Sequence, residues 1–328
     1  CMRSSLIMEE KRTTIAVMTS GGDSPGMNAA IRGVYSRASE YGYRVLGIRD
    51  GYTGLLKKDI IELTYKDVEY IVQRGGTILG TSRCEAFMKL DGQKKAAEIC
   101  REYDISAVIV IGGDGSFRGA LALAAQGIGV IGIPGTIDLD IGCTEYTLGY
   151  DTAANAAMEA IDRIADTSWA HHCYSVVEVM GRRAGYIAMS CGIASAAQKI
   201  LIPERQTMEH LIDDLRQRKK TGGVIVLSEG VGKAKDVADL IEKELNIHTR
   251  VNVLGFLQRG GKPTCIDRVF GCRMGAFAVD LIQKKKVCHV VAVQHGNLVA
   301  EQIENALSEK REFPEELYLV GRTVSHAG

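Results

Sequence analysis

The sequence has little of what would mark a membrane, secreted or nucleic-acid-binding protein. Among its 328 residues, 40 basic and 40 acidic side chains cancel, which leaves no overall charge to attract nucleic acid. No apolar stretch approaches the ~20 residues of a membrane helix, and the first residues lack the apolar core of a secretory signal. The nine cysteines are irregularly spaced without a C-x-x-C pair, which favours reduced thiols. We therefore expect a cytoplasmic protein without a membrane or nucleic-acid partner.

Proline is also scarce, at five residues, whereas glycine is abundant, at 37. Short apolar runs alternate with amphipathic stretches along both halves of the chain. The runs predict strands at 13–20, 43–51, 106–116, 129–136, 173–181 and 222–230. The amphipathic stretches predict helices at 93–104, 118–127, 207–220 and 235–246, and one after a turn within 21–42, which Pro25 is placed to begin. This alternation predicts an α/β fold with two similar lobes, each a mainly parallel sheet with helices on both faces.

Three glycine-bearing loops follow predicted strands. In open parallel sheets, ligands bind beyond the carboxyl ends of the strands. Gly21 and Gly22 can present backbone N–H groups to a phosphate, although a plain turn explains this pair equally well. Asp114 stands between Gly113 and Gly115, which suits a magnesium ion resting on phosphates, with an Asp-Gly turn as the alternative. Two such loops in one chain favour a phosphate site.

The third loop, PGTIDLDIG at 134–142, carries two acids. Asp138 and Asp140 have two possible interpretations: exposed side chains on a surface turn, or a catalytic base and a metal ligand. Residues two apart on an extended chain point to the same side, so we expect both carboxylates to face one site with Leu139 turned away. Their repulsion calls for a cation. Magnesium beside Asp140 would supply it while Asp138 meets the attacking hydroxyl.

From about Thr13 to about Ser308 the sequence resembles the bacterial ATP-dependent 6-phosphofructokinase family. The matching motifs, in order, are TSGGDSPGMNAAIRG, DGYTGL, RGGTILGTSRC, VIGGDGS, PGTIDLDI, VVEVMGRRAG and VLGFLQRGGKP. The resemblance implies a homotetramer with sites shared between subunits, and the conversion of fructose 6-phosphate and ATP to fructose 1,6-bisphosphate and ADP. It also implies a larger ATP-binding lobe, 12–149 with 262–312, and a smaller sugar-phosphate-binding lobe, 150–261 with 313–328.

The same resemblance implies roles for individual positions. Asp138 matches the catalytic base, with Thr136 and Arg182 beside it in the catalytic set. Asp114 and Asp140 match magnesium positions. The positions on the ATP side are Gly22, Tyr52, Arg83, Cys84, Gly113, Asp114, Gly115 and Ser116. The sugar-phosphate positions are Thr136, Asp138, Cys173, Met180, Gly181, Arg182, Glu229, Arg250, Phe256 and Arg259.

Two glycines indicate which phosphoryl donor the resemblance favours, ATP or pyrophosphate. Pyrophosphate-using members of the family carry Asp where Gly115 stands and Lys where Gly135 stands. Glycine leaves space for the adenosine side of ATP, so the resemblance favours ATP as co-substrate, with Mg²⁺ as its cofactor.

Three positions depart from the family's usual motifs. Leu139 replaces an Asn, Cys173 an Arg and Phe256 a His, and the last two would otherwise contact the sugar phosphate. The departures are compatible with drift and rebuilt contacts. They are also compatible with a kinase of the same fold that has a changed acceptor, or with a weakly active regulatory subunit paired with an active paralogue.

The effector region departs as well. Arg32, Arg218 and Lys220 keep basic character, but the usual arginines and glutamate are replaced by Ser36, Tyr65, Ala165 and Gln198. We therefore expect ADP and phosphoenolpyruvate to regulate this chain little.

Overall fold

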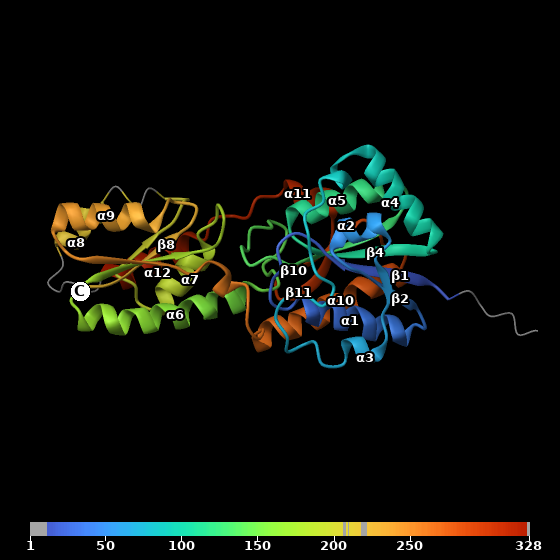
Figure 1. Ribbon diagram of the computed structural model, residues 1–328, viewed down its shortest axis with the longest axis horizontal. Helices are drawn as coiled ribbons and strands as arrows, with labels where there is room; N and C mark the ends of the chain where they lie inside the picture. The colour runs from blue at the N-terminus through green and yellow to red at the C-terminus, as the bar shows by residue number, and fades with distance from the viewer. Residues whose placement is uncertain (1–11, 206–207, 209, 218–221, 327–328) are drawn as a thin grey trace, which may run out of the picture.

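The computed structural model describes residues 12–205, 208, 210–217 and 222–326. Its strands form two separate sheets, one in each of two lobes that lie side by side (Figure 1). Helices cover both faces of each sheet, so the predicted α/β fold is confirmed. Within the described residues, no helix combines the length and the apolar character that crossing a membrane requires.

The larger sheet has seven strands in the order β11-β10-β5-β4-β1-β2-β3. All neighbours pair in parallel except the two edge strands, β3 and β11, which run antiparallel to β2 and β10. The bounds are β1 Thr14–Thr19, β2 Arg44–Ile48, β3 Ile60–Glu62, β4 Ile105–Gly112, β5 Gly129–Pro134, β10 His289–Gln294 and β11 Asn297–Gln302. The central strands are buried on both faces, which explains why they read as continuous apolar runs.

Two layers of helices enclose this sheet. One layer contains α1 (Met27–Glu40), α3 (Tyr65–Val68) and α10 (Cys265–Gln283). The other contains α2 (Gly51–Lys57), η1 (Ala86–Met88), α4 (Leu90–Glu102), α5 (Asp114–Ala124) and α11 (Ile303–Ser308). Helices α1 and α10 pack backbone to backbone, because a Cβ atom at Gly33 would lie 2.3 Å from the carbonyl oxygen of Cys272.

The smaller sheet has four parallel strands in the order β7-β8-β6-β9. The bounds are β6 Tyr174–Val179, β7 Lys199–Leu201, β8 Gly223–Ser228 and β9 Thr249–Val253. On one face lie α8 (Leu211–Arg216) and α9 (Ala234–Leu245), and on the other α6 (Tyr150–Ala170), α7 (Tyr186–Ala194) and α12 (Glu315–His326). A short turn of helix, η2 (Gly255–Gln258), follows β9.

The chain passes between the lobes three times. It enters the smaller lobe through α6, returns through the segment before α10, and crosses again between α11 and α12. The strands of the larger sheet therefore fall at 14–134 and 289–302, and those of the smaller sheet at 174–253.

Two local expectations differ from the structure. Helix α1 begins at Met27 rather than at Pro25, because Gly26 takes a left-handed conformation (φ 95°) and ends a turn that contains the proline. The helix predicted over 207–220 is observed only as α8, while 207, 209 and 218–220 lie outside the described residues.

A buried carboxylate, Asp267, joins the segments at the junction of the lobes. It lies in the first turn of α10 and is fully buried. Its oxygens accept hydrogen bonds from Tyr146 Oη (2.6 Å), Gly149 N (2.7 Å) and Thr152 N (2.9 Å), and from the Thr152 hydroxyl. One side chain thus holds the loop before α6 and the first turn of α6 against the start of α10.

We predict that Asp267→Asn lowers the free energy of unfolding by about 2–4 kcal/mol, because the amide nitrogen cannot accept the hydrogen bonds made to the oxygen it replaces. Urea unfolding followed by circular dichroism measures the change. Asp239→Asn is the matched control, since Asp239 is exposed and pairs with Lys235 one turn away, and it should cost no more than about 0.5 kcal/mol. Equal effects of the two substitutions would contradict the role given to Asp267.

Candidate active site

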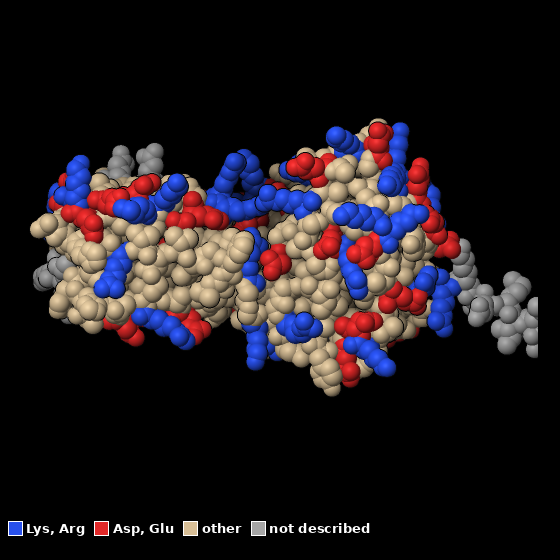
Figure 2. Space-filling view, viewed as in Figure 1, with Lys and Arg blue, Asp and Glu red and all other residues tan. Residues whose placement is uncertain are grey.

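Three neighbouring strands of the larger sheet end at one cleft. Strands β1, β4 and β5 lie side by side, and their carboxyl ends lead into the loops with the glycines and Asp114 that the sequence singled out. Backbone and side-chain bonds tie the loops together, since Gly135 N donates to Gly112 O (2.9 Å) and Ser116 Oγ donates to Ser20 O (2.9 Å). The cleft has a volume of ≈ 640 Å³. Lys and Arg side chains gather where the two lobes meet (Figure 2).

One wall of the cleft is aromatic. Tyr52 of α2 stacks on Phe87 of η1 with 4.1 Å between ring centroids, and both side chains are buried. The Tyr52 hydroxyl donates to the Ser116 carbonyl (2.8 Å), which fastens α2 to the first turn of α5. Arg83 and Cys84 line the same wall. The stacked rings therefore form an apolar wall of the cleft.

Several lining residues were missed by the sequence reasoning. Phe87 and Met88 come from η1, a short helix that no motif marked. Arg118, Gly119 and Ala122 come from α5. Positions 118, 119 and 122 lie three, four and seven residues after Gly115, so they share one face of the helix with it. A helix predicted to begin at Asp114 would therefore have indicated that these residues line the cleft.

The two acids of the third loop share one guanidinium. Arg182 Nε lies 3.5 Å from Asp138 Oδ2, and Arg182 Nη1 lies 3.8 Å from Asp140 Oδ2. Asp138 is 2% exposed, and its Oδ1 has no hydrogen-bond partner within the described part of the chain. Burial, with the neighbouring Asp140 charge, raises the pKa of Asp138 to about 6, against the opposing effect of Arg182. Asp138 is therefore a stronger base than an ordinary carboxylate.

The expectation of an extended chain between these acids is wrong. Leu139 has a φ of 54°, in the left-handed region, where a branched side chain is strained. Its side chain packs with Ile137 in the apolar core of the smaller lobe, and this burial holds the backbone turn. Leu139 does point away from the acids, but a turn rather than strand alternation brings Asp138 and Asp140 to Arg182.

The loop after β6 positions Arg182. Gly181 and Arg182 both have positive φ values, 140° and 54°. Glu229, after β8, accepts hydrogen bonds from both backbone N–H groups, at 3.1 Å and 2.7 Å. The neighbouring Met180 N donates to the side chain of Gln258 (2.8 Å). The smaller sheet therefore delivers a fixed cation to the acids of the larger lobe.

A second guanidinium closes the other side of the cleft. Arg259 Nη1 donates to the carbonyl oxygen of Asp23 (2.7 Å), which connects the segment after η2 to the loop after β1. A Cβ atom at Gly22 would lie 2.7 Å from that nitrogen, so the absence of a side chain at Gly22 makes room for it.

Two carboxylates fit a magnesium site. Burial raises the pKa of Asp140 against the opposing effect of Arg182, and the charge of Asp114 adds to the rise. Mg²⁺ takes one or two carboxylates together with substrate phosphates and water, and it relieves such repulsion. Among the described residues no group of three or more His, Cys, Asp or Glu side chains forms a complete metal cage. The arrangement fits an ion that arrives with a polyphosphate.

Six of the ten implied sugar-phosphate positions do not line the cleft of their own chain. Met180, Gly181 and Glu229 adjoin Arg182 through the contacts given above, and the other three are Cys173, Arg250 and Phe256. Cys173 is buried at the amino end of β6, where its carbonyl accepts from Gly223 N (3.1 Å). Arg250 pairs with Ser175 near that same end. Phe256 is 82% exposed on η2. Cys173 and Arg182 stand at opposite ends of a strand of six residues, which spans roughly 20 Å.

The effector positions that the structure describes fall in two places, one in each lobe. The Arg32 guanidinium stacks on Tyr65, 4.8 Å from the ring centroid, near Ser36 on the same helix. Gln198 lies in the other lobe and accepts a hydrogen bond from Val224 N, and Ala165 lies on α6. Arg218 and Lys220 lie outside the described residues.

Comparisons with known proteins show which family this chain is similar to. A family model described as phosphofructokinase matches residues 14–282. The ATP-dependent 6-phosphofructokinase of Clostridium tetani (strain Massachusetts / E88) is 47% identical over 316 residues, which cover 95% of this chain and 99% of that protein. The ATP-dependent 6-phosphofructokinase of Clostridium botulinum (strain Hall / ATCC 3502 / NCTC 13319 / Type A) is 46% identical with the same coverage.

Solved structures of phosphofructokinases have a similar fold. Phosphofructokinase from Saccharomyces cerevisiae superposes with a TM-score of 0.85 at 30% identity over 95% of this chain, which spans 46% of the yeast chain's length. The pyrophosphate-dependent phosphofructokinase from Marinobacter aquaeolei has a TM-score of 0.83 over 93% of this chain and 86% of its own. At 21% identity, that likeness shows the fold alone. From the family model and the clostridial relatives together, this chain belongs to the phosphofructokinase family.

Proposed function

We propose that this protein transfers the γ-phosphoryl group of MgATP to the 1-hydroxyl of fructose 6-phosphate, giving fructose 1,6-bisphosphate and ADP. The observation that carries the proposal is the pair Asp138 and Asp140, held by Arg182 at the mouth of a glycine-lined cleft. The clostridial relatives, which this chain matches over nearly their full length, bear the same activity in their names.

Asp138 is the base. Its buried Oδ1 is available to accept the proton of the attacking hydroxyl, and its raised pKa strengthens that acceptance. The hydroxyl oxygen then bonds to the γ-phosphorus as the bond to the bridging β,γ-oxygen breaks. The Thr136 hydroxyl orients the base, because it accepts a hydrogen bond from Asp138 N (3.2 Å). Arg182 and Arg259 oppose the charge of the transferring group.

ATP occupies the cleft along the aromatic wall. The residues on that side are Gly22, Tyr52, Arg83, Cys84, Gly113, Asp114, Gly115 and Ser116. Asp114 and Asp140 would hold Mg²⁺, which supplies charge neutralisation on the phosphates when bound. Gly115 favours ATP over pyrophosphate because the space beside its Cα is open for the nucleotide.

The sugar phosphate is held from two chains. Met180, Gly181, Arg182, Glu229 and Arg259 lie on the Asp138 side of one chain, and Cys173 and Arg250, near the amino end of β6, come from a neighbour. Phe256 lies on η2, after the carboxyl end of β9, on the Met180 side of its own chain. An exposed apolar strip on the edge strand β9 and on η2 supports a homotetramer. Val253 is 62% exposed and Leu257 is 58% exposed, and an uncovered sheet edge of this kind is a site of association.

A changed acceptor is the second candidate. Cys173 is buried and Phe256 is apolar, so neither offers a cation to a sugar 6-phosphate. Assays of a panel of sugars with ATP and with pyrophosphate distinguish the two candidates.

We place the protein in the cytoplasm, because all eight cysteines of the described part are free thiols.

We predict that Asp138→Ser lowers kcat by at least about a hundredfold, because the attacking hydroxyl loses its proton acceptor. Steady-state kinetics with fructose 6-phosphate measure the loss. Calorimetric titration with MgATP is the control and should show little change in affinity, which also establishes that the variant is folded. A near-normal kcat would rule out Asp138 as the base.

We predict that Gly115→Asp raises the KM for ATP by roughly tenfold, since a second carboxylate beside Asp114 repels the polyphosphate. Gly115→Ala is the matched control and should stay within about twofold, because nothing lies within 4 Å of a Cβ atom at this position. Equal KM values for the two variants would contradict the argument. Turnover with pyrophosphate and none with ATP would overturn the choice of donor.

We predict that Val253→Lys lowers the molar mass in solution, because a desolvated charge at the β9 edge opposes association. Size-exclusion chromatography with light scattering measures it. Leu90→Lys, at an exposed apolar position on α4, should leave the mass unchanged. A monomeric wild-type protein would refute the assembly proposed above.

A further inference from the structure

Gln258 is a fully buried polar side chain that has no part in the function proposed above. It is the last residue of η2, it directly precedes Arg259, and it does not line the cleft. Its Oε1 accepts a hydrogen bond from Met180 N (2.8 Å), whereas its Nε2 has no hydrogen-bond partner among the described residues. The bond to Met180 is therefore the polar contact that gives this buried amide its place.

The position of this bond follows from the way in which strands β6 and β9 end. Leu254 N donates to Glu178 O (3.0 Å), which continues the parallel pairing of the two strands one residue past β9. In a regular parallel ladder the next donor, Met180 N, would bond to Leu254 O. That carbonyl instead accepts from Leu257 N (3.1 Å), because the chain turns into η2 there. The side chain of Gln258 supplies the acceptor in its place.

The same bond joins the two segments that carry the guanidiniums of the site. Met180 precedes the turn that presents Arg182 to Asp138. Gln258 precedes Arg259, whose guanidinium is bonded to the loop after β1 in the larger lobe. The bond between Met180 and Gln258 thus fixes the backbones of the two arginines relative to each other and, through the second arginine, relative to the larger lobe.

We propose that Gln258 is a positioning residue for phosphoryl transfer, which sets the spacing of the Arg182 and Arg259 guanidiniums about the transferring group. The inference rests on the proposed function, in which both guanidiniums oppose the charge of that group. Stabilisation of this kind depends on fixed distances, and a displacement of about 1 Å can cost roughly a hundredfold in rate. Gln258 acts on the reaction through the two arginines, because it does not line the cleft.

Two substitutions separate the acceptor atom from the volume of the side chain. Gln258→Met has a similar length but offers Met180 N only a weak acceptor. Gln258→Glu keeps an oxygen for Met180 N, and the oxygen that replaces Nε2 breaks no hydrogen bond, because that nitrogen has no partner in the described part of the chain.

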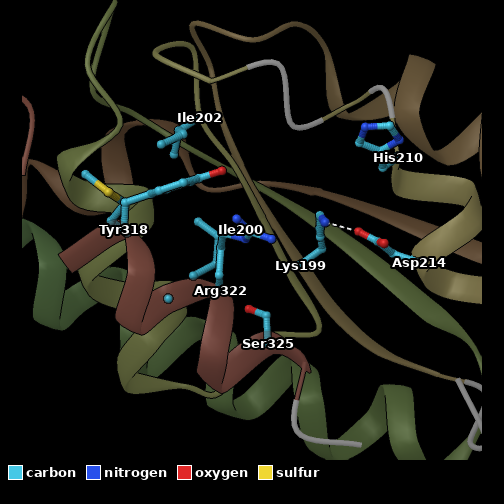
Figure 3. A pocket seen from close by; sticks show the side chains of 10 residues that line it. Lys199, Ile200, Ile202, His210, Asp214, Tyr318, Arg322 and Ser325 are labelled. Atoms are coloured by element: carbon cyan, nitrogen blue, oxygen red, sulfur yellow. Dashed lines mark hydrogen bonds and ion pairs between the residues drawn. The ribbon is translucent and has the colours of Figure 1, made fainter. Parts of the chain in front are cut away.

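Lys199→Met is the matched control, since it also replaces a polar side chain of the smaller lobe by methionine. Lys199 is only 14% exposed and pairs with Asp214 (Figure 3). Both residues line a cavity between β7 and α12 that shares no lining residue with the cleft. The control therefore removes a buried polar contact without touching the segments of the two arginines.

We expect Gln258→Met to lower kcat by roughly tenfold or more, because displaced guanidiniums lose interactions made in the transition state. The KM for ATP should stay within about twofold, because the loops and the aromatic wall on the ATP side are unchanged. Gln258→Glu should keep kcat within about threefold of the wild type, and Lys199→Met within about twofold. Steady-state kinetics measure these values, and thermal melting establishes that the variants are folded. A wild-type kcat in Gln258→Met, or equal losses in Gln258→Met and Lys199→Met, would overturn the positioning role.

Hydrogen exchange tests the contact itself, without the reaction. An amide that loses its acceptor exchanges faster, so peptides that contain residues 180–182 should exchange faster in Gln258→Met than in the wild type. They should exchange at the wild-type rate in Gln258→Glu and Lys199→Met. Unchanged exchange in Gln258→Met would overturn the contact as a constraint on the turn. Exchange does not depend on the acceptor sugar, so failure of the proposed function, seen as a wild type that is inactive with fructose 6-phosphate, remains distinguishable from failure of this contact.

Discussion

The buried carboxylate of Asp267 is the constraint on which the arrangement of the lobes depends. It satisfies backbone N–H groups at Gly149 and Thr152, where the chain leaves the larger lobe and α6 begins. A carboxylate without water must be fully hydrogen-bonded to stay charged, so these segments have few other ways to pack. The loop that carries Asp138 and Asp140 lies just before them in the chain, and Thr147 Oγ1 donates to Thr136 O (2.7 Å) within it. The loop with the two acids is thus anchored at its outgoing end.

The electrostatics of the site follow from placing two acids on one guanidinium. Arg182 offsets part of the repulsion between Asp138 and Asp140, yet the pKa values of both carboxyls remain raised because burial outweighs its effect. The raised pKa values of these two carboxyls therefore follow from burial more than from the charges around them. Because Arg182 comes from the smaller lobe, the position of that lobe affects the basicity of Asp138, in addition to burial and the charge of Asp140.

The smaller lobe positions Arg182 through hydrogen bonds to the backbone of the turn that carries it. Glu229 fixes the N–H groups of Gly181 and Arg182, and Glu204 fixes that of Gly185. The turn that presents Arg182 is therefore held at both ends by carboxylates that follow neighbouring strands, β8 and β7.

Local patterns in the sequence determined the buried strands and the glycine loops after them, because apolar runs and loop chemistry act over a few residues. The sequence reasoning also identified the family, since the motifs are contiguous. Only the tertiary structure decided the left-handed turn at Leu139, whose cause is burial in the core of the other lobe. It alone placed Phe87 and Met88 on the cleft and Cys173 far from it in its own chain. These outcomes depend on which distant segments pack together. Such contacts join residues far apart in the chain, so they cannot be predicted from the local sequence pattern around either residue.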